Sequence, residues 1–403
     1  MGLLPQRNVY PAFFLILLFA APIRAVPPTT IVWAAPAILG AALMIAWAAE
    51  SSQFFIPQGF ALAILAWMQT LPEFAVEGLL AWHQQVPLLL AGLTGALRLL
   101  TGLGWPVIYC TAATFHRRRT GTPLGAIALD KHHAVEVTGL LLPLIYIGFI
   151  AIKTSITVYD GMVLILIYAA YLLILTRLPP EKEESIEELE VIPRTIVTAP
   201  PAVRVTTIIS LFAAGGLLIY FSAEPFLASL LAISTAVGIP SFVFIQWVAP
   251  LVSEFPEMAS TVYFARMAGR APMALMNMVS SNINQWTLLT AMLPIIYSIS
   301  LGVETPIHLD GKQQVELWMT LGQALMGMMF LLNMELAWWE ATALFVLFVT
   351  PFAIPSEAKV VTILYFAWAG MELVRMIGRR RMPAALTGFC DVWRTHIRRT
   401  AHS

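Results

Sequence analysis

The chain has 403 residues, of which 59% are hydrophobic and only 11% are charged, and its formal net charge is zero. In soluble domains about a quarter of the residues are charged. The composition therefore excludes an ordinary soluble protein and indicates a polytopic membrane protein in a lipid bilayer. The balanced charge gives no support for nucleic-acid binding. The two cysteines, Cys110 and Cys390, match no disulfide framework or metal spacing, and no cofactor is expected.

Long apolar runs alternate with short polar segments, without the ten-residue alternation that is typical of a membrane β-barrel. A helix needs about 20 apolar residues to cross a bilayer. The sequence therefore predicts an all-α fold with helices over residues 9–25, 31–50, 57–81, 86–112, 134–153, 157–176, 205–231, 238–266, 272–301, 315–333, 336–354 and 358–376.

Composition changes divide the chain into six parts. The apolar run after Arg7 predicts an N-terminal helix or a signal-like segment, and Arg24 favours the uncleaved helix. Six glutamates between Glu181 and Glu190, bracketed by prolines, indicate a polar linker, of which a short part can be a solvated helix. The expected parts are an N-terminal segment (1–30), a first repeat (31–176), the acidic linker (177–204), a second repeat (205–354), an extra helix (355–376) and a basic tail (377–403).

Basic residues set the orientation of the predicted helices. They gather at Arg117–Arg119, at Arg266 and Arg270, and at Arg375 and Arg379–Arg381, which the predicted helices place on the same side as the acidic linker. The positive-inside rule makes this side cytoplasmic, so both termini are expected in the cytoplasm and the protein in the plasma (inner) membrane. The basic tail is interpreted as a topology signal with a disordered end, and contact with anionic lipid is the alternative.

Two predicted helices share an unusual motif. Leu71-Pro72-Glu73 and Phe255-Pro256-Glu257 lie at an offset of 184 residues, in helices that are expected to run in opposite directions across the membrane. Repeats of inverted topology are a common construction of secondary transporters. The two motifs therefore predict two related halves.

Pro-Glu within the membrane has a specific chemistry. Proline removes a backbone donor and breaks or kinks the helix, which frees carbonyl oxygens. A buried carboxylate is costly unless it is paired, protonated or bound to a cation. Oxygen ligands of this kind suit Ca²⁺, and also Mn²⁺ or Mg²⁺. Glu73 and Glu257 are therefore candidate cation ligands, with two kinked helices that carry protonated glutamates as the alternative.

Both halves contain further motifs, and together they resemble the sodium/calcium exchanger family of the cation/calcium antiporter superfamily. The second Pro-Glu helix is followed by "ALMNMVSSNINQW" (274–286), which is similar to the small-residue helix of that family. The first is followed by "LAGLTGALRLLTG" (90–102), a degraded copy. The preceding helices also echo one another, with "WAAE" ending at Glu50 and "FSAE" ending at Glu224.

The resemblance implies a ten-helix core of two inverted five-helix repeats, to which the first and last predicted helices are additions. It implies an antiporter that moves Ca²⁺ in exchange for Na⁺ or H⁺ by alternating access, and Ca²⁺ held by Glu73 and Glu257. The other positions that it implicates in ion binding are Thr70, Ser253, Asn277, Ser281 and Asn282. Oligomeric state is left open.

The chain also departs from the family pattern. Glu254 adds a carboxylate where a hydroxyl is usual, and neighbouring carboxylates disfavour one another's ionisation, which favours proton coupling through Glu254 or Glu257. Arg98 lies 25 residues after Glu73, as Asn282 does after Glu257. Because arginine cannot coordinate a metal ion, Arg98 is interpreted as a tethered cation at the site, or alternatively as an interfacial side chain.

Glu77 stands four residues after Glu73, on the same face of the predicted helix. It is interpreted as the charge partner of Arg98 or as a ligand at the outer mouth, and an interfacial glutamate is the alternative.

Two other functions have partial support in the sequence. "DKHHAVE" (130–136) places His132, His133 and Glu136 together, but a zinc enzyme needs three or four converging ligands and no second ligand set is apparent. We therefore expect no enzyme activity and interpret the segment as a charged juxtamembrane turn. A cation-binding or sensing protein that has lost transport is the other alternative, because Arg98 and the altered residues before Pro72 depart from the family pattern.

Overall fold

The computed structural model describes residues 26–52, 54–55, 70–178, 186, 189–378 and 382–397. Four predictions therefore lie wholly or partly outside the described residues: the helix over 9–25, the first part of the helix over 57–81, most of the acidic run, and Arg379–Arg381.

The first half of the chain is built almost entirely from helices. Its elements are η1 (Pro28–Thr30), α2 (Ile31–Ser52), α4 (Leu71–Trp82), α5 (Val86–Leu99), the π-helix η2 (Leu100–Gly104), α6 (Trp105–Thr120), β1 (Ala126–Ala128), η3 (Lys131–His133), α7 (Ala134–Gly139), α8 (Leu141–Lys153), β2 (Ser155–Ile156) and α9 (Val158–Leu175). Helix α10 (Val191–Thr198) follows in the linker.

The second half repeats this order. Its elements are α11 (Pro201–Val237), α12 (Ser241–Ser253), α13 (Phe255–Ala265), α14 (Ala271–Asn284), the π-helix η4 (Gln285–Leu289), α15 (Thr290–Leu301), β3 (Ile307–His308), α16 (Gly311–Leu331), β4 (Glu335–Ala337) and α17 (Trp338–Ala353). The chain continues with η5 (Pro355–Glu357), α18 (Ala358–Gly378), α19 (Ala384–Val392) and η6 (Trp393–Ile397).

Four short strands reveal the symmetry between the halves. Strand β1 pairs with β4 and β2 pairs with β3, both antiparallel, so each half lends one strand to each pair. This exchange is what two inverted copies of the same motif would make. Strands of two or three residues are too short to produce a sequence pattern, so they were not predicted.

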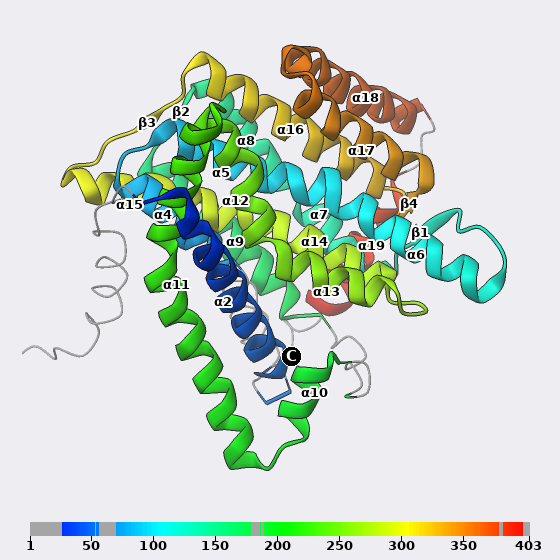
Figure 1. Cartoon of the computed structure of the whole chain (residues 1–403). Helices are drawn as coiled ribbons and strands as arrows, with labels where there is room; N and C mark the ends of the chain where they lie inside the picture. Colours follow the sequence, from blue (N-terminus) through cyan, green and yellow to red (C-terminus); the bar gives the residue numbers. More distant parts are fainter. Residues whose placement is uncertain are drawn as a thin grey trace, which may run out of the picture.

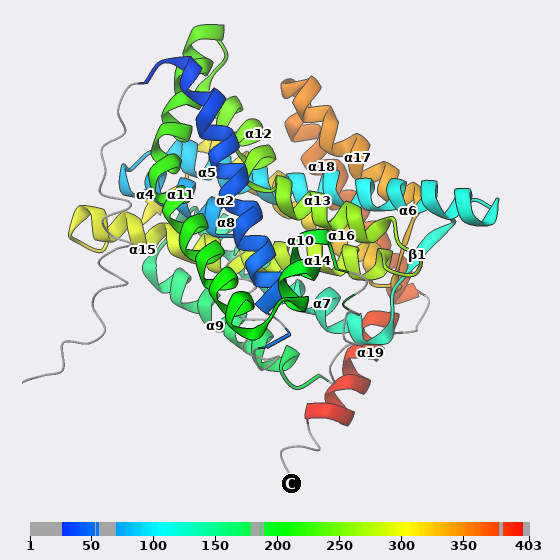
Figure 2. The same ribbon diagram turned by 60° about the horizontal axis from the view of Figure 1, so that its bottom comes forward.

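Helices α2 and α11 pack together along one face of the bundle, as Figures 1 and 2 show. Helices α16, α17 and α18 lie on the other side of the molecule, and the segments α4–α5 and α14–α15 run between the two groups (Figure 1). The core between them is apolar, and its largest fully buried side chains include Trp105 and Trp286.

Six helical segments of the described chain are long and apolar enough to cross a membrane by length and composition. They are 28–52, 86–120, 131–153, 158–175, 201–237 and 355–378, and α12 and α17 are shorter apolar helices. The all-α membrane fold with two inverted repeats is thus confirmed. Helix α12 stops short because the chain breaks at Glu254, two residues before Pro256, as the Pro-Glu motif predicted.

Two expectations about the connecting segments need correction. The basic tail is not simply a disordered end, because it contains α19, which packs against η3 and α7. Helix α10 of the linker is not fully solvated, since Pro193, Ile196 and Val197 are buried where it meets α2 and α11. In both cases a short helix is stabilised by packing that its own sequence cannot reveal.

Gly95 holds α5 against α12. A Cβ at Gly95 would stand 1.9 Å from the carbonyl oxygen of Gln246, so the two backbones are in direct contact. We expect Gly95→Ala to force the helices apart and to lower the free energy of unfolding by about 1–3 kcal/mol. Unfolding by SDS in mixed micelles measures this change.

Gly40→Ala in α2 is the matched control, because nothing lies within 4 Å of its added Cβ. Alanine is the better helix former, so the control should be neutral or slightly stabilising. Equal unfolding midpoints for the two variants would contradict the proposed contact.

Candidate ion-binding site

Two helix starts bring the Pro-Glu motifs into the core. Pro72 and Glu73 lie in the first turn of α4, and Pro256 and Glu257 lie in the first turn of α13. Proline is well tolerated at this position because first-turn N–H groups have no partner within the helix. Both carboxylates therefore stand at the positive end of a helix, which favours a negative charge.

Gln285 connects the two halves of the site. Its Nε2 donates to Glu73 Oε2 at 2.9 Å and also to Glu254 Oε1. Glu73, Glu254 and Gln285 are all buried. Glu254 in turn lies within hydrogen-bonding reach of both Glu73 and Glu257. Three carboxylates, one from the first half and two from the second, thus form one cluster, which we call the carboxylate cluster (Glu73, Glu254 and Glu257).

Helix α14 supplies further polar groups to the carboxylate cluster. Ser281 Oγ donates to Glu257 Oε2 at 2.9 Å, and Asn284 Nδ2 donates to Thr70 Oγ1 at 3.1 Å. The sequence-predicted residues Thr70 and Ser281 therefore lie beside the predicted carboxylates. Asn284 and Gln285 were missed, although their place on the helix that carries Ser281 was the available signal.

The π-helices η2 and η4 occupy equivalent places in the two halves. Each extends a central helix at the level of the site, and Gln285 is the first residue of η4. A π-helical turn shifts the side chains that follow it around the helix axis and occurs often at functional sites. Thr101 of η2 donates to Asn282 Oδ1 at 3.3 Å, so the two central helices meet through polar side chains.

The remaining predicted ligands lie less directly at the cluster. Asn282 is buried, but its Nδ2 donates to the backbone of Met278 and its Oδ1 accepts from Thr101. Ser253 Oγ bonds back to Ala249 and Pro250 of its own helix. Among the described residues, Asn277 is half-buried and has no hydrogen bond to the carboxylate cluster. Ion binding by these three residues stays a prediction.

Four oxygen atoms of the cluster and of the neighbouring Glu77 and Gln285 have no hydrogen-bond partner. They are Glu73 Oε1, Glu77 Oε2, Glu257 Oε1 and Gln285 Oε1, all buried. No lysine or arginine of the described chain forms an ion pair with the carboxylate cluster. Buried acceptors without donors are costly, so the arrangement favours protons or a hard cation in their midst.

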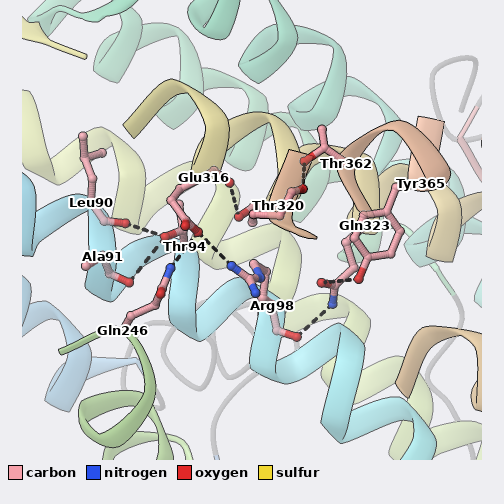
Figure 3. Close-up of polar contacts among 11 residues, drawn as sticks. Leu90, Ala91, Thr94, Arg98, Gln246, Glu316, Thr320, Gln323, Thr362 and Tyr365 are labelled. Carbon is pink, nitrogen blue, oxygen red and sulfur yellow. Dashed lines mark hydrogen bonds and ion pairs between the residues drawn. The ribbon is translucent and has the colours of Figure 1, made fainter. Parts of the chain in front are cut away.

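Arg98 has a different partner from the one expected. Its Nη1 donates to Glu316 Oε2 of α16 at 2.8 Å (Figure 3). Its guanidinium lies over the ring of Trp247. The predicted pairing with Glu77 or with the carboxylate cluster is therefore wrong. The error arose because Glu316 lies 218 residues away, beyond the reach of local spacing. Arg98 is also no interfacial side chain, since only 2% of it is exposed.

Glu77 stays inside the protein as well, so it is not an interfacial glutamate. It is buried on α4, one turn beyond Glu73, and its Oε1 lies 3.1 Å from the position that a Cβ on Gly92 would take. Glycine at that position thus leaves room for the carboxylate.

The histidine segment lies at η3, where Asp130, His132 and His133 bring potential ligand atoms within 4.8 Å of one another.

Comparisons with known proteins also divide the chain into two related halves. The family model described as "Sodium/calcium exchanger protein" matches residues 27–177 and 207–354, one segment in each half. The solved structure of the H⁺/Ca²⁺ exchanger CAX is 30% identical, with a TM-score of 0.83, over 96% of this chain and 95% of that chain. No curated protein matches the chain.

Two more distant structures share the fold. Native YfkE is 13% identical with a TM-score of 0.61, over 88% of this chain and 99% of that chain. The sodium-calcium exchanger NCX_Mj, soaked with Na⁺ and Sr²⁺, is 16% identical with a TM-score of 0.53, over 84% and 99%.

Proposed function

Because this chain belongs to the sodium/calcium exchanger family, as the match over both halves establishes, we propose that it is a cation antiporter that exchanges Ca²⁺ for H⁺ across the membrane by alternating access. Transport by members of this family excludes the enzyme interpretation of the histidine cluster. We propose protons, rather than Na⁺, as the coupling ion.

One observation carries the assignment: the carboxylate cluster joins both halves of the chain around Gln285. Up to three negative charges gather where no basic side chain of the described chain pairs with them. A divalent cation needs such a set of oxygens, and one buried oxygen each of Glu73 and Glu257 lacks a hydrogen-bond partner, as do Glu77 Oε2 and Gln285 Oε1 outside the cluster. Glu73 and Glu257 are proposed as the Ca²⁺ ligands, with Thr70 and Ser281 in supporting positions.

Proton coupling is supported by the composition of the cluster. When Ca²⁺ leaves, adjacent carboxylates repel one another. A proton that binds to one of them removes its charge directly, whereas Na⁺ would have to be coordinated. Glu254, at the break between α12 and α13, is the carboxylate that the family pattern does not supply. The similarity to an H⁺/Ca²⁺ exchanger supports the same coupling.

The orientation is also part of the proposal. The acidic linker, the basic clusters and both termini are placed in the cytoplasm by the positive-inside rule, in a plasma-membrane protein. The carboxylate cluster then lies between α4, α13 and α14, and the paired helices α2 and α11 pack on one side of it. Sliding of the paired helices α2 and α11 against the rest of the bundle would expose the cluster to one side of the membrane and then to the other.

Uptake of radioactive calcium into proteoliposomes tests this function. A proton gradient alone should drive uptake, and a sodium gradient at equal pH should not. Uptake driven only by sodium would overturn proton coupling while leaving the antiporter intact. Calcium binding without uptake under either gradient would instead favour a sensor.

A further inference from the structure

The turn before α7 gathers metal-ligating side chains that ion transport does not use. Asp130, His132 and His133 each bring a potential ligand atom within 4.8 Å of the others, and Glu136 follows on α7. We call these four residues the histidine turn. They lie at η3 and α7, against which α19 packs, whereas the carboxylate cluster lies on α4 and at the start of α13. Cation transport through the carboxylate cluster leaves the histidine turn without a role.

The backbone of η3 explains why these side chains converge. A 3₁₀ helix has about three residues per turn, so side chains three positions apart lie on the same face. Asp130 and His133 have this spacing, and the backbone N–H of His133 donates to the carbonyl oxygen of Asp130 at 3.1 Å. His132 lies beside His133, with 4.3 Å between the ring centroids. The turn therefore presents two imidazoles and a carboxylate together.

The carboxylate of Asp130 does not cap the helix that it precedes. Asp130 is the N-cap residue of η3, a position at which aspartate commonly accepts from the backbone, yet its side chain makes no capping hydrogen bond. Asp130 is exposed, His132 is half-buried and His133 is buried. The group is therefore open to solvent on the side of Asp130, which gives a cation a path of entry.

Glu136 adds a second carboxylate one turn further along the chain. Its Oε1 lies 4.0 Å from His133 Nδ1, and its Oε2 is buried and has no hydrogen-bond partner among the described residues. A histidine that binds a metal usually donates its second ring N–H to a carboxylate, which fixes the orientation of the ring. Glu136 lies close to the position for this role. Asp130 and Glu136 together supply two negative charges, which balance one divalent cation.

Helix α19 holds the histidine turn in place. It lies beside α7 in both views of the molecule (Figures 1 and 2). A Cβ at Gly388 would stand 2.9 Å from Ala134 Cβ and 3.4 Å from the carbonyl oxygen of Lys131, so the backbone of α19 is in close contact with the turn. Ligands on a backbone that is fixed by packing lose less freedom when they bind an ion.

We propose that the histidine turn binds a divalent transition-metal ion of the Zn²⁺ class through Asp130, His132 and His133, with Glu136 orienting the ring of His133. At metal–ligand distances of about 2.0–2.2 Å, tetrahedral ligand atoms lie about 3.3–3.6 Å apart, so the exposed Asp130 and the half-buried His132 move inward on binding. Imidazole nitrogen suits Zn²⁺, Ni²⁺ or Cu²⁺, whereas Ca²⁺ takes oxygen ligands. The ion bound here is therefore distinct from the transported one.

Zinc binding to the purified full-length protein without a histidine tag tests the proposal. Isothermal titration calorimetry in excess Ca²⁺, which occupies the carboxylate cluster, should give one Zn²⁺ per chain. His132→Ala should weaken binding about 100-fold or more, and Glu136→Gln about 10–100-fold. Co²⁺ in place of Zn²⁺ should show the visible absorption of a tetrahedral site, and His132→Ala should remove it.

His308→Ala is the matched control, because His308 is an exposed histidine of β3, which pairs with β2 at the opposite end of α8 from η3. It should bind Zn²⁺ as the unchanged protein does. Glu73→Gln should also retain the zinc site, which separates it from the carboxylate cluster. The proposal is wrong if no Zn²⁺ binds, if His132→Ala binds as His308→Ala does, or if binding falls with Glu73→Gln and not with His132→Ala.

Discussion

Glu73→Gln is expected to lower calcium uptake about 100-fold or more, because the transported ion loses a charged ligand. Glutamine preserves the volume of the side chain and an acceptor for the bond from Gln285 Nε2. The fold should therefore survive, and the loss should come from charge alone. Uptake into proteoliposomes under a proton gradient measures the effect, and Glu257→Gln is expected to behave in the same way.

Glu340→Gln separates this effect from a general loss of buried carboxylates. Glu340 is as buried as Glu73, but its Oε2 accepts from the backbone N–H of Ala337 at the start of α17, outside the carboxylate cluster. Glutamine retains that acceptor, so uptake should remain near normal. Uptake by Glu73→Gln at the level of Glu340→Gln would remove Glu73 from the site.

The fold was largely predictable, because a segment in lipid must form all its backbone hydrogen bonds internally and is therefore helical. Such helices are visible in the sequence as long apolar runs. The duplicated Pro-Glu motif added the inverted symmetry. What the sequence concealed were features that depend on distant partners. The strand pairs are one example, since Ile127 of β1 lies opposite Leu336 of β4. Helix α19 is another, because this short segment is held as an ordered helix by its packing on α7.

The carboxylate cluster shows the same division. Glu73 and Glu257 were predictable because a carboxylate beside proline in an apolar run is costly unless it holds a proton or a cation. Gln285 was missed because its role depends on two distant partners, Glu73 and Glu254, and its place after Ser281 on the same helix was the one signal available. Arg98 was assigned to the wrong partner by spacing alone, and Glu316 went unnoticed among the polar residues near the start of α16.

Glu316→Gln is expected to lower the free energy of unfolding by about 3–5 kcal/mol, since it leaves the Arg98 guanidinium buried without a counter-charge. Glu316 is 13% exposed and Arg98 only 2%, so water cannot compensate fully. The backbone of Arg98 is also fixed, because its carbonyl accepts from Gln323 Nε2 at 2.9 Å (Figure 3). The side chain therefore cannot easily move to solvent. Unfolding by SDS in mixed micelles measures the loss.

A double variant and a surface pair make this prediction specific. Adding Arg98→Gln to Glu316→Gln removes the stranded charge, so the double variant should be more stable than the single one. Glu372→Gln breaks the pair with Arg375, which is 53% exposed, and should cost about 1 kcal/mol or less. If Glu316→Gln costs no more than Glu372→Gln, Arg98 reaches water and the pair has no role in holding α5 to α16. A large cost for the single variant and a small one for the double would show that Arg98 and Glu316 neutralise each other, which leaves the full charge of the carboxylate cluster for the transported ions.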